Sequence, residues 1–224
     1  MASVKITSGN LAKIIQESIE HVLSESLYAG LDDIVNENEL TRIAINKGFN
    51  LIGYHNTDEE GLTCFYVRSD SGIHFGSLKA ANDRGKTRAD DSRSDKYFLK
   101  VKSPLVIEKD FDWERENFID WCPDKDECLD NVDIFAYFEK TLGWDIMVYN
   151  DNGEPWYGKS VKDLINEHGY DCIIYKNEVE DAGKYSIAMF EPNNIKLACE
   201  TVDDNGKPIP LSQRFNTSTN DIRY

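Results

Sequence analysis

The spacing of apolar residues changes near residue 49, and this change constrains the fold more than any other feature of the chain. Before it, apolar side chains recur at helical spacing over residues 8–27, which predicts an amphipathic helix. After it, apolar residues gather in short runs at 49–54, 170–175 and 185–190, which predict strands. The sequence therefore predicts an α+β protein, with a helical segment before a strand-rich domain.

Capping residues and glycines predict where the other helices begin and end. Asn36 and Glu39 form a capping-box-like pattern at the start of a helix over 36–46, and Gly48 suits the position after its end. Three more helices are expected from similar signals: 78–84 after Ser77, 133–142 before Gly143, and 161–168 between Ser160 and Gly169.

The remaining strands are less regular. Short strands are expected at 64–68 and 73–75, and a strong one at 96–107. Pro104 lies within the last of these and should interrupt or terminate it, because proline has no N–H for a sheet hydrogen bond. Residues 110–131 carry many charges and are expected to be an insertion or a poorly regular segment.

These patterns predict three parts. Residues 1–48 form an N-terminal helical segment, residues 49–201 a folded domain, and residues 202–224 an extended tail, since the tail is polar and without an apolar period. With 40% hydrophobic residues, the chain can bury a real core.

Composition argues against several classes of protein. No apolar run approaches the roughly 18 residues that span a bilayer, and the N-terminus lacks the apolar region of a secretory signal. Five cysteines in irregular spacing favour free thiols in a reducing cytoplasm over disulfides, and no metal site is expected.

The charge is strongly acidic but uneven. A net charge of −16 argues against general nucleic-acid binding, because lysine and arginine drive attraction to phosphate backbones. Residues 79–102 nevertheless hold eight basic and four acidic residues. This segment is either a solvated loop or a local attraction for an anionic ligand.

Two histidine motifs and one acidic pair are candidates for chemistry. His55 ends a strand and is followed two residues later by Thr57, so both side chains would face one ligand, unless His55 is simply a surface residue. His74 lies in Gly-Ile-His-Phe-Gly, where its ring and that of Phe75 could stack on a flat heteroaromatic group; the alternative is a buried, hydrogen-bonded histidine.

The glycines of that motif, Gly72 and Gly76, would let the backbone approach a ligand closely. Glu178 and Glu180 stand two residues apart at the end of a strand. A carboxylate there could stabilise a developing positive charge, although a solvated acidic loop is the plainer interpretation.

Four stretches together resemble ADP-ribosyltransferase-like domains, especially those of large polyvalent proteins of phages and conjugative elements. They occur in the family's order: YHNT, SGIHFGSLKAANDR, KYFLKVKSPLVI and GYDCIIYKNEVEDAGKYSIAMFEPNNIKLA. The tail DDNGKPIPLSQRFNTSTNDIRY is similar to a segment that often follows such domains. The resemblance covers about residues 49–224 and implies a split β-sandwich of two small sheets with NAD bound between them.

The resemblance also implies roles for individual residues. His55 and Thr57 would hold the adenosine-side ribose and the nicotinamide, and His74, with Phe75 beside it, would lie against the nicotinamide. An acidic residue near the last strands would hold the nicotinamide ribose; Glu180 is favoured for it over Glu178.

Two departures from the family pattern stand out. Asn56 occupies the middle of the first motif, where many relatives have glycine, and could crowd the carboxamide. Ser186 falls where the alignment of the last strand would place the acid. Arg84 and Arg88, from the basic segment, are the candidates for holding the pyrophosphate.

The implied activity is cleavage of the nicotinamide–ribose bond of NAD, which is consumed as a substrate, and transfer of ADP-ribose to an acceptor, with a protein acceptor favoured. The alternative is a catalytically degenerate module that keeps the fold and binds or inhibits a host or phage protein. An acidic mimic of nucleic acid is a third possibility. The expected location is the cytoplasm of a bacterium that hosts the mobile element, and the oligomeric state is left open.

Overall fold

The structure is a computed structural model that describes residues 29–67, 72–87, 92–111, 134–146, 148–149, 155–156 and 159–224. The predicted helix over 8–27, Arg88 and most of the predicted insertion at 110–131 lie outside the described residues.

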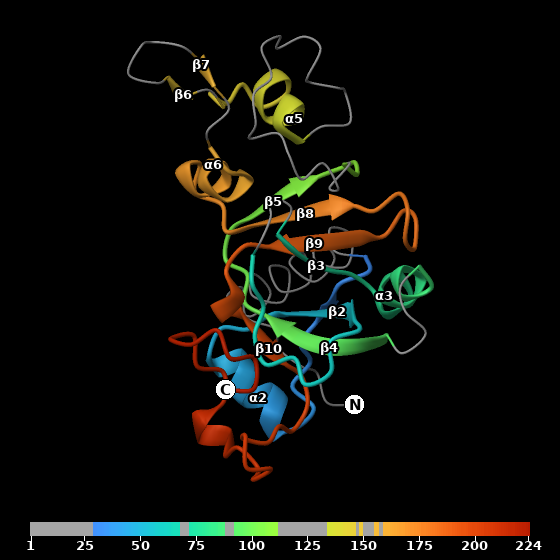
Figure 1. Cartoon of the computed structure of the whole chain (residues 1–224), viewed down its shortest axis with the longest axis vertical. Helices are drawn as coiled ribbons and strands as arrows, with labels where there is room; N and C mark the ends of the chain where they lie inside the picture. Colours follow the sequence, from blue (N-terminus) through green and yellow to red (C-terminus); the bar gives the residue numbers. More distant parts are fainter. Residues whose placement is uncertain are drawn as a thin grey trace, which may run out of the picture.

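Two small four-stranded sheets form the centre of the molecule (Figure 1). The first has the order β1-β2-β4-β10: Asp32–Asp33, Leu51–Thr57, Arg93–Leu99 and Ile195–Leu197. The second has the order β3-β9-β8-β5: Ile73–Phe75, Tyr185–Met189, Cys172–Lys176 and Pro104–Ile107. A separate two-stranded sheet pairs β6 (Val148–Tyr149) with β7 (Pro155–Trp156).

Four described α-helices complete the α+β architecture: α2 (Glu39–Asn46), α3 (Leu78–Gly85), α5 (Ile134–Lys140) and α6 (Val161–Glu167). Most of the strand pairs are antiparallel, whereas β5 and β8 run parallel. The α+β class and the two small sheets are therefore confirmed.

The main core lies between the two sheets. Strand β2 alternates its side chains, so Leu51 joins this core while Ile52 faces the other way. Across the strand pair, Tyr97 and Leu99 of β4 do the same, with Phe98 turned outward. The larger set in this core includes Phe65, Phe75, Ile174, Ile187, Met189, Ile195 and Ile222.

The two sheets also meet through the backbone at one point. Tyr54 and Gly76 exchange two hydrogen bonds, with N···O distances of 2.9 and 3.0 Å. This bridge joins the middle of β2 to the residue that follows β3, so the two histidine motifs are brought side by side.

Each sheet has a second apolar layer on its outer face. Helices α5 and α6 cover the outer face of the second sheet, where Phe138 and Leu164 pack against Ile173 and Phe190. On the first sheet, α2 and the C-terminal segment (residues 202–224) lie over the outer face, and Phe215 packs against Phe49 and Phe98. These contacts cross the predicted boundaries at residues 48 and 201.

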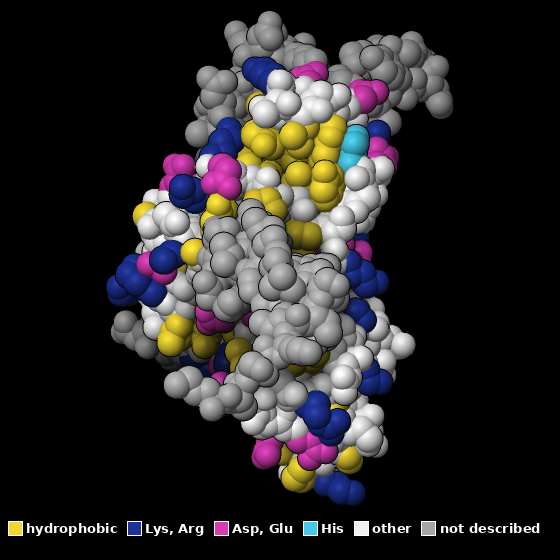
Figure 2. Space-filling view, turned by 180° about the vertical axis from the view of Figure 1, so that it is seen from behind, with side chains coloured by type: hydrophobic (Ala, Val, Ile, Leu, Met, Phe, Trp, Pro, Cys, Tyr) yellow, Lys and Arg dark blue, Asp and Glu magenta, His cyan; other side chains and the backbone are white. Residues whose placement is uncertain are grey.

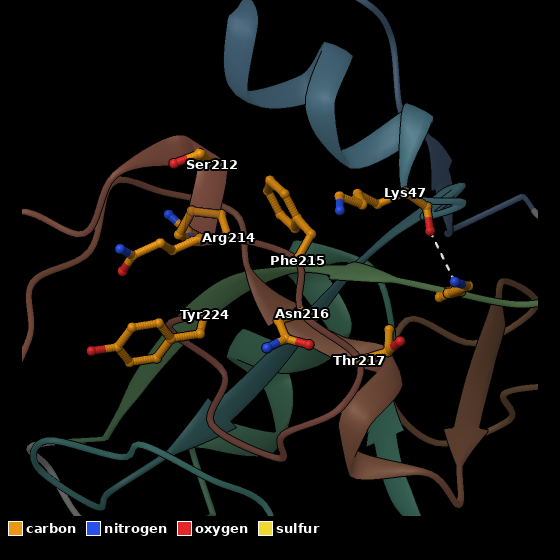
Figure 3. A pocket seen from close by; sticks show the side chains of 9 residues that line it. Lys47, Ser212, Arg214, Phe215, Asn216, Thr217 and Tyr224 are labelled. Atoms are coloured by element: carbon orange, nitrogen blue, oxygen red, sulfur yellow. Dashed lines mark hydrogen bonds between the residues drawn. The ribbon is translucent and has the colours of Figure 1, made fainter.

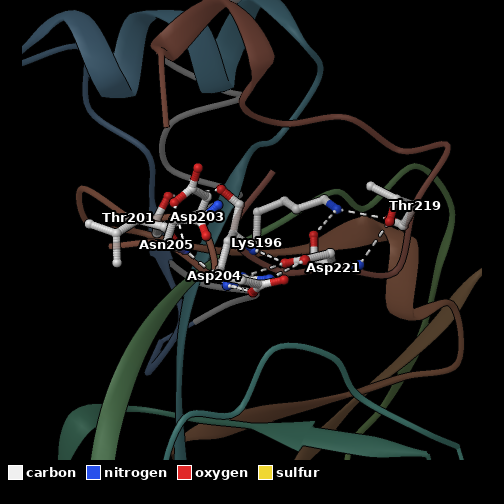
Figure 4. Close-up of polar contacts among 9 residues, drawn as sticks. Lys196, Thr201, Asp203, Asp204, Asn205, Thr219 and Asp221 are labelled. Carbon is white, nitrogen blue, oxygen red and sulfur yellow. Dashed lines mark hydrogen bonds and ion pairs between the residues drawn. The ribbon is translucent and has the colours of Figure 1, made fainter. Parts of the chain in front are cut away.

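The C-terminal segment is irregular but firmly attached (Figure 4). The side chain of Lys196, in β10, donates to the carbonyl oxygens of Thr219 and Asp221 at 2.9 and 2.7 Å. Arg223 pairs with the carboxylates of Asp204 and Asp221. These bonds hold the segment in place without a long helix or strand.

The local predictions succeed at some positions and fail at others. Ser77 and Ser160 cap α3 and α6 as expected. The predicted Asn36 cap is wrong: Asn38 caps α2, because its side chain and that of Thr41 bond each other's backbone N–H groups.

Two strand predictions also need correction. The expected strand at 64–68 is wrong in its described part, where Cys64 makes a single bridge to Asp221 and no strand forms. Pro104 does break the run at 96–107, but it begins β5 in the second sheet, so the run supplies strands to both sheets.

The described surface is mixed in charge. On the face shown in Figure 2, basic and acidic side chains are interspersed, with a gathering of hydrophobic side chains beside a histidine. Within the described residues, no helix has both the length and the apolar character required to cross a bilayer.

Candidate functional site

The two predicted histidines are neighbours at the junction of the sheets. Nδ1 of His55 lies 2.8 Å from the backbone carbonyl oxygen of His74. The His55 ring packs against the rings of Phe65 and Phe75, with centroids 5.2 and 5.5 Å away. Because successive strand residues point to opposite faces, the His74 side chain leaves β3 on the side away from Phe75.

His74 is paired with a buried tyrosine that sequence reasoning did not single out. Nδ1 of His74 lies 2.8 Å from the hydroxyl of Tyr175 in β8, and the two rings meet edge to face. Burial, and then the negative charges of Asp110 and Glu180, raise the pKa of Tyr175 well above its ordinary value. The hydroxyl therefore stays protonated at neutral pH and can serve as a hydrogen-bond donor.

Asn177 builds the turn that carries the acidic residues. Its side-chain oxygen accepts hydrogen bonds from the N–H groups of Val179 and Glu180, at 2.9 and 2.8 Å. Its side-chain nitrogen donates to the Glu180 carboxylate at 3.2 Å and to the Ser186 hydroxyl at 3.1 Å. Asparagine is suited to this position because its amide can bond nearby backbone groups. One buried side chain thus fixes both the turn and the Glu180 carboxylate.

Glu180 and Glu178 are in different surroundings. The Glu180 carboxylate lies 3.6 Å from the Arg84 guanidinium, and its side chain is only 22% exposed. Glu178 is exposed, and its backbone N–H donates to the Asp110 carboxylate. Of the two predicted acids, Glu180 is the one that joins the other polar groups.

We name these groups the Glu180 cluster. They come from β3, α3, β8, the turn after β8, and β9: His74, Arg84, Tyr175, Asn177, Glu180 and Ser186. Tyr175 and Asn177 are two residues apart, so both project from the same face of the chain at the end of β8. The cluster combines a carboxylate, a guanidinium, an imidazole and hydroxyls, which suits an anionic ligand bearing hydroxyl groups and a developing positive charge.

Gly76 is required for the close approach of α3 and β9. A Cβ at this position would lie 2.9 Å from the Ser186 hydroxyl and 3.0 Å from Ala80. Ala80 and Ala81 are both buried, and their small side chains allow this close packing.

The side chains of Asn56 and Thr57 both form hydrogen bonds within the protein. The Asn56 side chain donates a hydrogen bond to the Ser94 hydroxyl across the β2–β4 pair. Its amide nitrogen also lies close to Gly85, where an added Cβ would be only 2.5 Å away. It thus lies against the end of α3. The hydroxyl of Thr57 accepts a hydrogen bond from the N–H of Glu59.

Gly72 and Phe75 make packing contacts with neighbouring strands and rings. Gly72 has a φ of +75°, and a Cβ there would lie 3.0 Å from both the Met189 carbonyl oxygen and the Phe190 ring. Phe75 is 1% exposed and packs in the main core against Tyr97. The structure therefore brings His74, Arg84 and Glu180 together, with His55 adjacent. Phe75 lies in the packed interior, and the partly exposed Gly72 packs against Met189 and Phe190.

Four described basic residues of the 79–102 segment, Lys79, Arg84, Lys86 and Arg93, have acidic partners. Lys79 and Lys86 bind Asp83, whose pKa falls to about 2, chiefly through the Lys79 hydrogen bond. Arg93 pairs with Asp95, 2.9 Å away. These pairs reduce the positive potential that the sequence predicts here.

The cap of α3 is tied to the acidic turn. Ser77 donates to Asp181 at 2.6 Å, and Lys79 lies 3.3 Å from the same carboxylate. The Ser77 hydrogen bond is the main cause that lowers the pKa of Asp181. This contact holds α3, and with it Arg84, next to the turn that carries Glu180.

Comparison of the chain with protein-family models, curated proteins and solved structures found no match. Among the described residues, no group of three or more histidine, cysteine, aspartate or glutamate side chains is arranged to hold a metal ion.

Proposed function

We propose that this chain is an NAD-dependent ADP-ribosyltransferase with the split β-sandwich of ADP-ribosyltransferase-like domains, and that Glu180 is its catalytic carboxylate. One observation carries the proposal. Asn177 fixes the Glu180 carboxylate beside the His74–Tyr175 pair, on the motifs that resemble the family. The two small sheets joined at Tyr54 and Gly76 support the fold assignment.

The chemistry needs a fixed negative charge. Cleavage of the nicotinamide–ribose bond releases nicotinamide as a neutral group and leaves positive charge on the ribose. A carboxylate held in advance next to that charge lowers the free energy of the transition state. Glu180 meets this requirement because its turn is fixed by Asn177 and its carboxylate is shielded.

The neighbouring side chains suit the rest of the substrate. The partly exposed His74 ring can lie against the nicotinamide, and the buried, protonated Tyr175 hydroxyl can hold His74 in one orientation. The Arg84 guanidinium can donate hydrogen bonds to two oxygens of a phosphate group. It would then either keep its ion pair with Glu180 at the same time or give it up. His55 remains a candidate for the ribose side, next to His74.

A matched pair of variants tests the role of Glu180. Glu180→Gln keeps the size of the side chain and removes its charge, so nicotinamide release should fall by about 10²–10³-fold. Affinity for NAD, measured by calorimetry, should change little. Glu178→Gln makes the same chemical change two residues away on an exposed side chain, and should leave the rate within about twofold. Equal rates in the Glu180→Gln variant and the unmodified protein would contradict the assignment.

A second function is favoured by a different observation. The Glu180 carboxylate is already engaged by Arg84 and Asn177, and Ser186 stands where the aligned acid would be. A module that keeps the fold without turnover, and binds or inhibits a partner protein, would tolerate both features. Its signature would be a folded protein that releases no nicotinamide at any NAD concentration, and whose Glu180→Gln variant still binds the partner.

A further inference from the structure

A pocket of about 460 Å³ lies between the end of α2 and the C-terminal segment (Figure 3). Its lining comprises Lys47, Lys100, residues 212–217 and Tyr224. None of these nine side chains is acidic, although the net charge of the chain is −16. The pocket lining therefore carries a local positive charge on an acidic protein, and it should attract anions.

The two lysines keep most of their donors available. Lys100 donates one hydrogen bond, 2.9 Å long, to the backbone carbonyl oxygen of Lys47, drawn as the dashed line in Figure 3. An ammonium group has three N–H donors, so two remain. Among the described residues, neither lysine has a carboxylate partner.

Arg214 supplies an observation of a different kind. Its side chain is buried, with 1% of the residue exposed. The two terminal nitrogens donate to the carbonyl oxygens of Cys199 and Leu197, each at 2.7 Å. The buried Nε–H has no hydrogen-bond partner in the described part of the chain. Such a group costs stability unless a ligand or another donor–acceptor partner satisfies it.

A purely structural role accounts for the terminal nitrogens of Arg214, but not for its Nε–H or its buried charge. Its bonds to the two carbonyls anchor the C-terminal segment to the end of β10, and they use only the terminal nitrogens. They also leave a buried positive charge without a carboxylate. Burial lowers the pKa of Lys196, and the nearby Arg214 charge lowers it further, while the Asp221 carboxylate opposes the shift. A bound anion would offset this excess of positive charge.

The pocket and the Glu180 cluster are built on different sheets. Phe215, in the pocket lining, packs on the outward-facing Phe98 of β4, in the first sheet. His74, Tyr175 and Ser186 of the Glu180 cluster belong to β3, β8 and β9 of the second sheet. The two sites are therefore distinct.

We propose that this pocket is a second ligand site, which binds a small phosphate-bearing anion through Lys47 and Lys100, with the buried positive charge of Arg214 in its lining. The side chains of Ser212, Asn216 and Thr217 add polar groups to the lining. The volume is within the range of pockets that hold small ligands, from free phosphate to a mononucleotide. The proposal does not depend on NAD cleavage.

Titration of the whole protein with inorganic phosphate tests the site. The experiment follows the assigned Arg214 Nε–H signal by NMR at constant ionic strength, with sodium chloride as the balancing salt. We expect a saturable shift of this signal with phosphate and none with chloride alone. A parallel titration with adenosine monophosphate distinguishes the ligands: tighter binding than phosphate assigns a nucleotide, and equal binding assigns free phosphate.

Two lysine variants provide a matched comparison. Lys47→Gln should weaken phosphate binding about five- to tenfold, because it removes a charged donor of the pocket. Lys102→Gln makes the same change in net charge on an exposed residue outside the lining, and should weaken binding less than about twofold. Both side chains are exposed, so neither change should prevent folding.

Two results would overturn the proposal. One is an Arg214 Nε–H signal that does not shift at the highest phosphate concentration tested. The other is an equal loss of affinity in Lys47→Gln and Lys102→Gln, which would mean that phosphate responds only to overall charge.

Discussion

Residues 79–102 and the C-terminal segment both present cations, but the two regions balance them in different ways. In the first, Lys86 and Arg93 pair with nearby carboxylates on the surface. In the second, Arg214 and the adjoining Lys196 are buried and bind backbone carbonyls. Exposed ion pairs contribute little to stability and little net potential, whereas a buried cation that bonds only carbonyl oxygens, as Arg214 does, leaves a positive charge. The partners of the basic residues in the fold, and not their number in a segment, therefore decide where positive charge remains.

The largest effect should come from the apolar anchor of the C-terminal segment. Phe215 is 1% exposed and packs on Phe49 and Phe98, so Phe215→Ala should lower the free energy of unfolding by about 3–5 kcal/mol. Denaturant unfolding measures this change. Val202, in the same segment, is 48% exposed, and Val202→Ala should cost no more than about 0.5 kcal/mol. Similar small losses for both would mean that the segment does not pack as described.

A smaller effect should appear in the pH dependence of stability. Burial is the main cause that lowers the pKa of Lys196 to about 8, with Asp221 opposing and Arg214 adding to the shift. Between this value and the ordinary lysine pKa, the unfolded chain binds more protons than the folded one, so stability should rise with pH. The destabilisation is complete below about pH 8 and is relieved as the pH increases.

Lys196→Met isolates this contribution. The unmodified protein should gain on the order of 1–3 kcal/mol of unfolding free energy relative to the variant between pH 7 and 10. The difference is obtained from denaturant curves of both proteins in the same buffers. A constant difference across this range would show that Lys196 titrates normally in the folded state.

The smallest effect should be at the surface pair of the other region. Arg93→Gln removes the ion pair between Arg93, whose side chain is 42% exposed, and Asp95, whose side chain is 29% exposed. The free energy of unfolding should change by no more than about 0.5 kcal/mol, and less at high salt. A loss comparable to that from Phe215→Ala would remove the contrast between the two regions.

The sequence predicted correctly those helix ends that are fixed by hydrogen bonds between residues close together in the chain. Ser77 and Ser160 cap their helices through bonds to groups three residues away, so the pattern alone was sufficient. The Asn36 prediction failed because Asn38 offers the same chemistry two residues later. The strand at 64–68 failed because Cys64 finds its partner, Asp221, near the other end of the chain.

The members of the Glu180 cluster were singled out only in part for the same reason. His74, Arg84 and Glu180 were candidates from the sequence, whereas Tyr175 and Asn177 were not singled out. The contacts within the cluster depend on the pairing of β3, β9 and β8, which joins residues far apart in sequence. A useful signal was present in Tyr-Lys-Asn-Glu-Val-Glu, where a tyrosine and an asparagine share one face before the acidic turn.

The most direct test of the proposed activity is nicotinamide release by the purified protein. The protein is incubated with NAD and a bacterial lysate, and free nicotinamide and labelled ADP-ribose are followed together. We predict release of nicotinamide with label on a macromolecule, and loss of both in Glu180→Gln. No release from a folded protein that also fails to bind NAD in calorimetry would contradict the proposal and would favour the binding module.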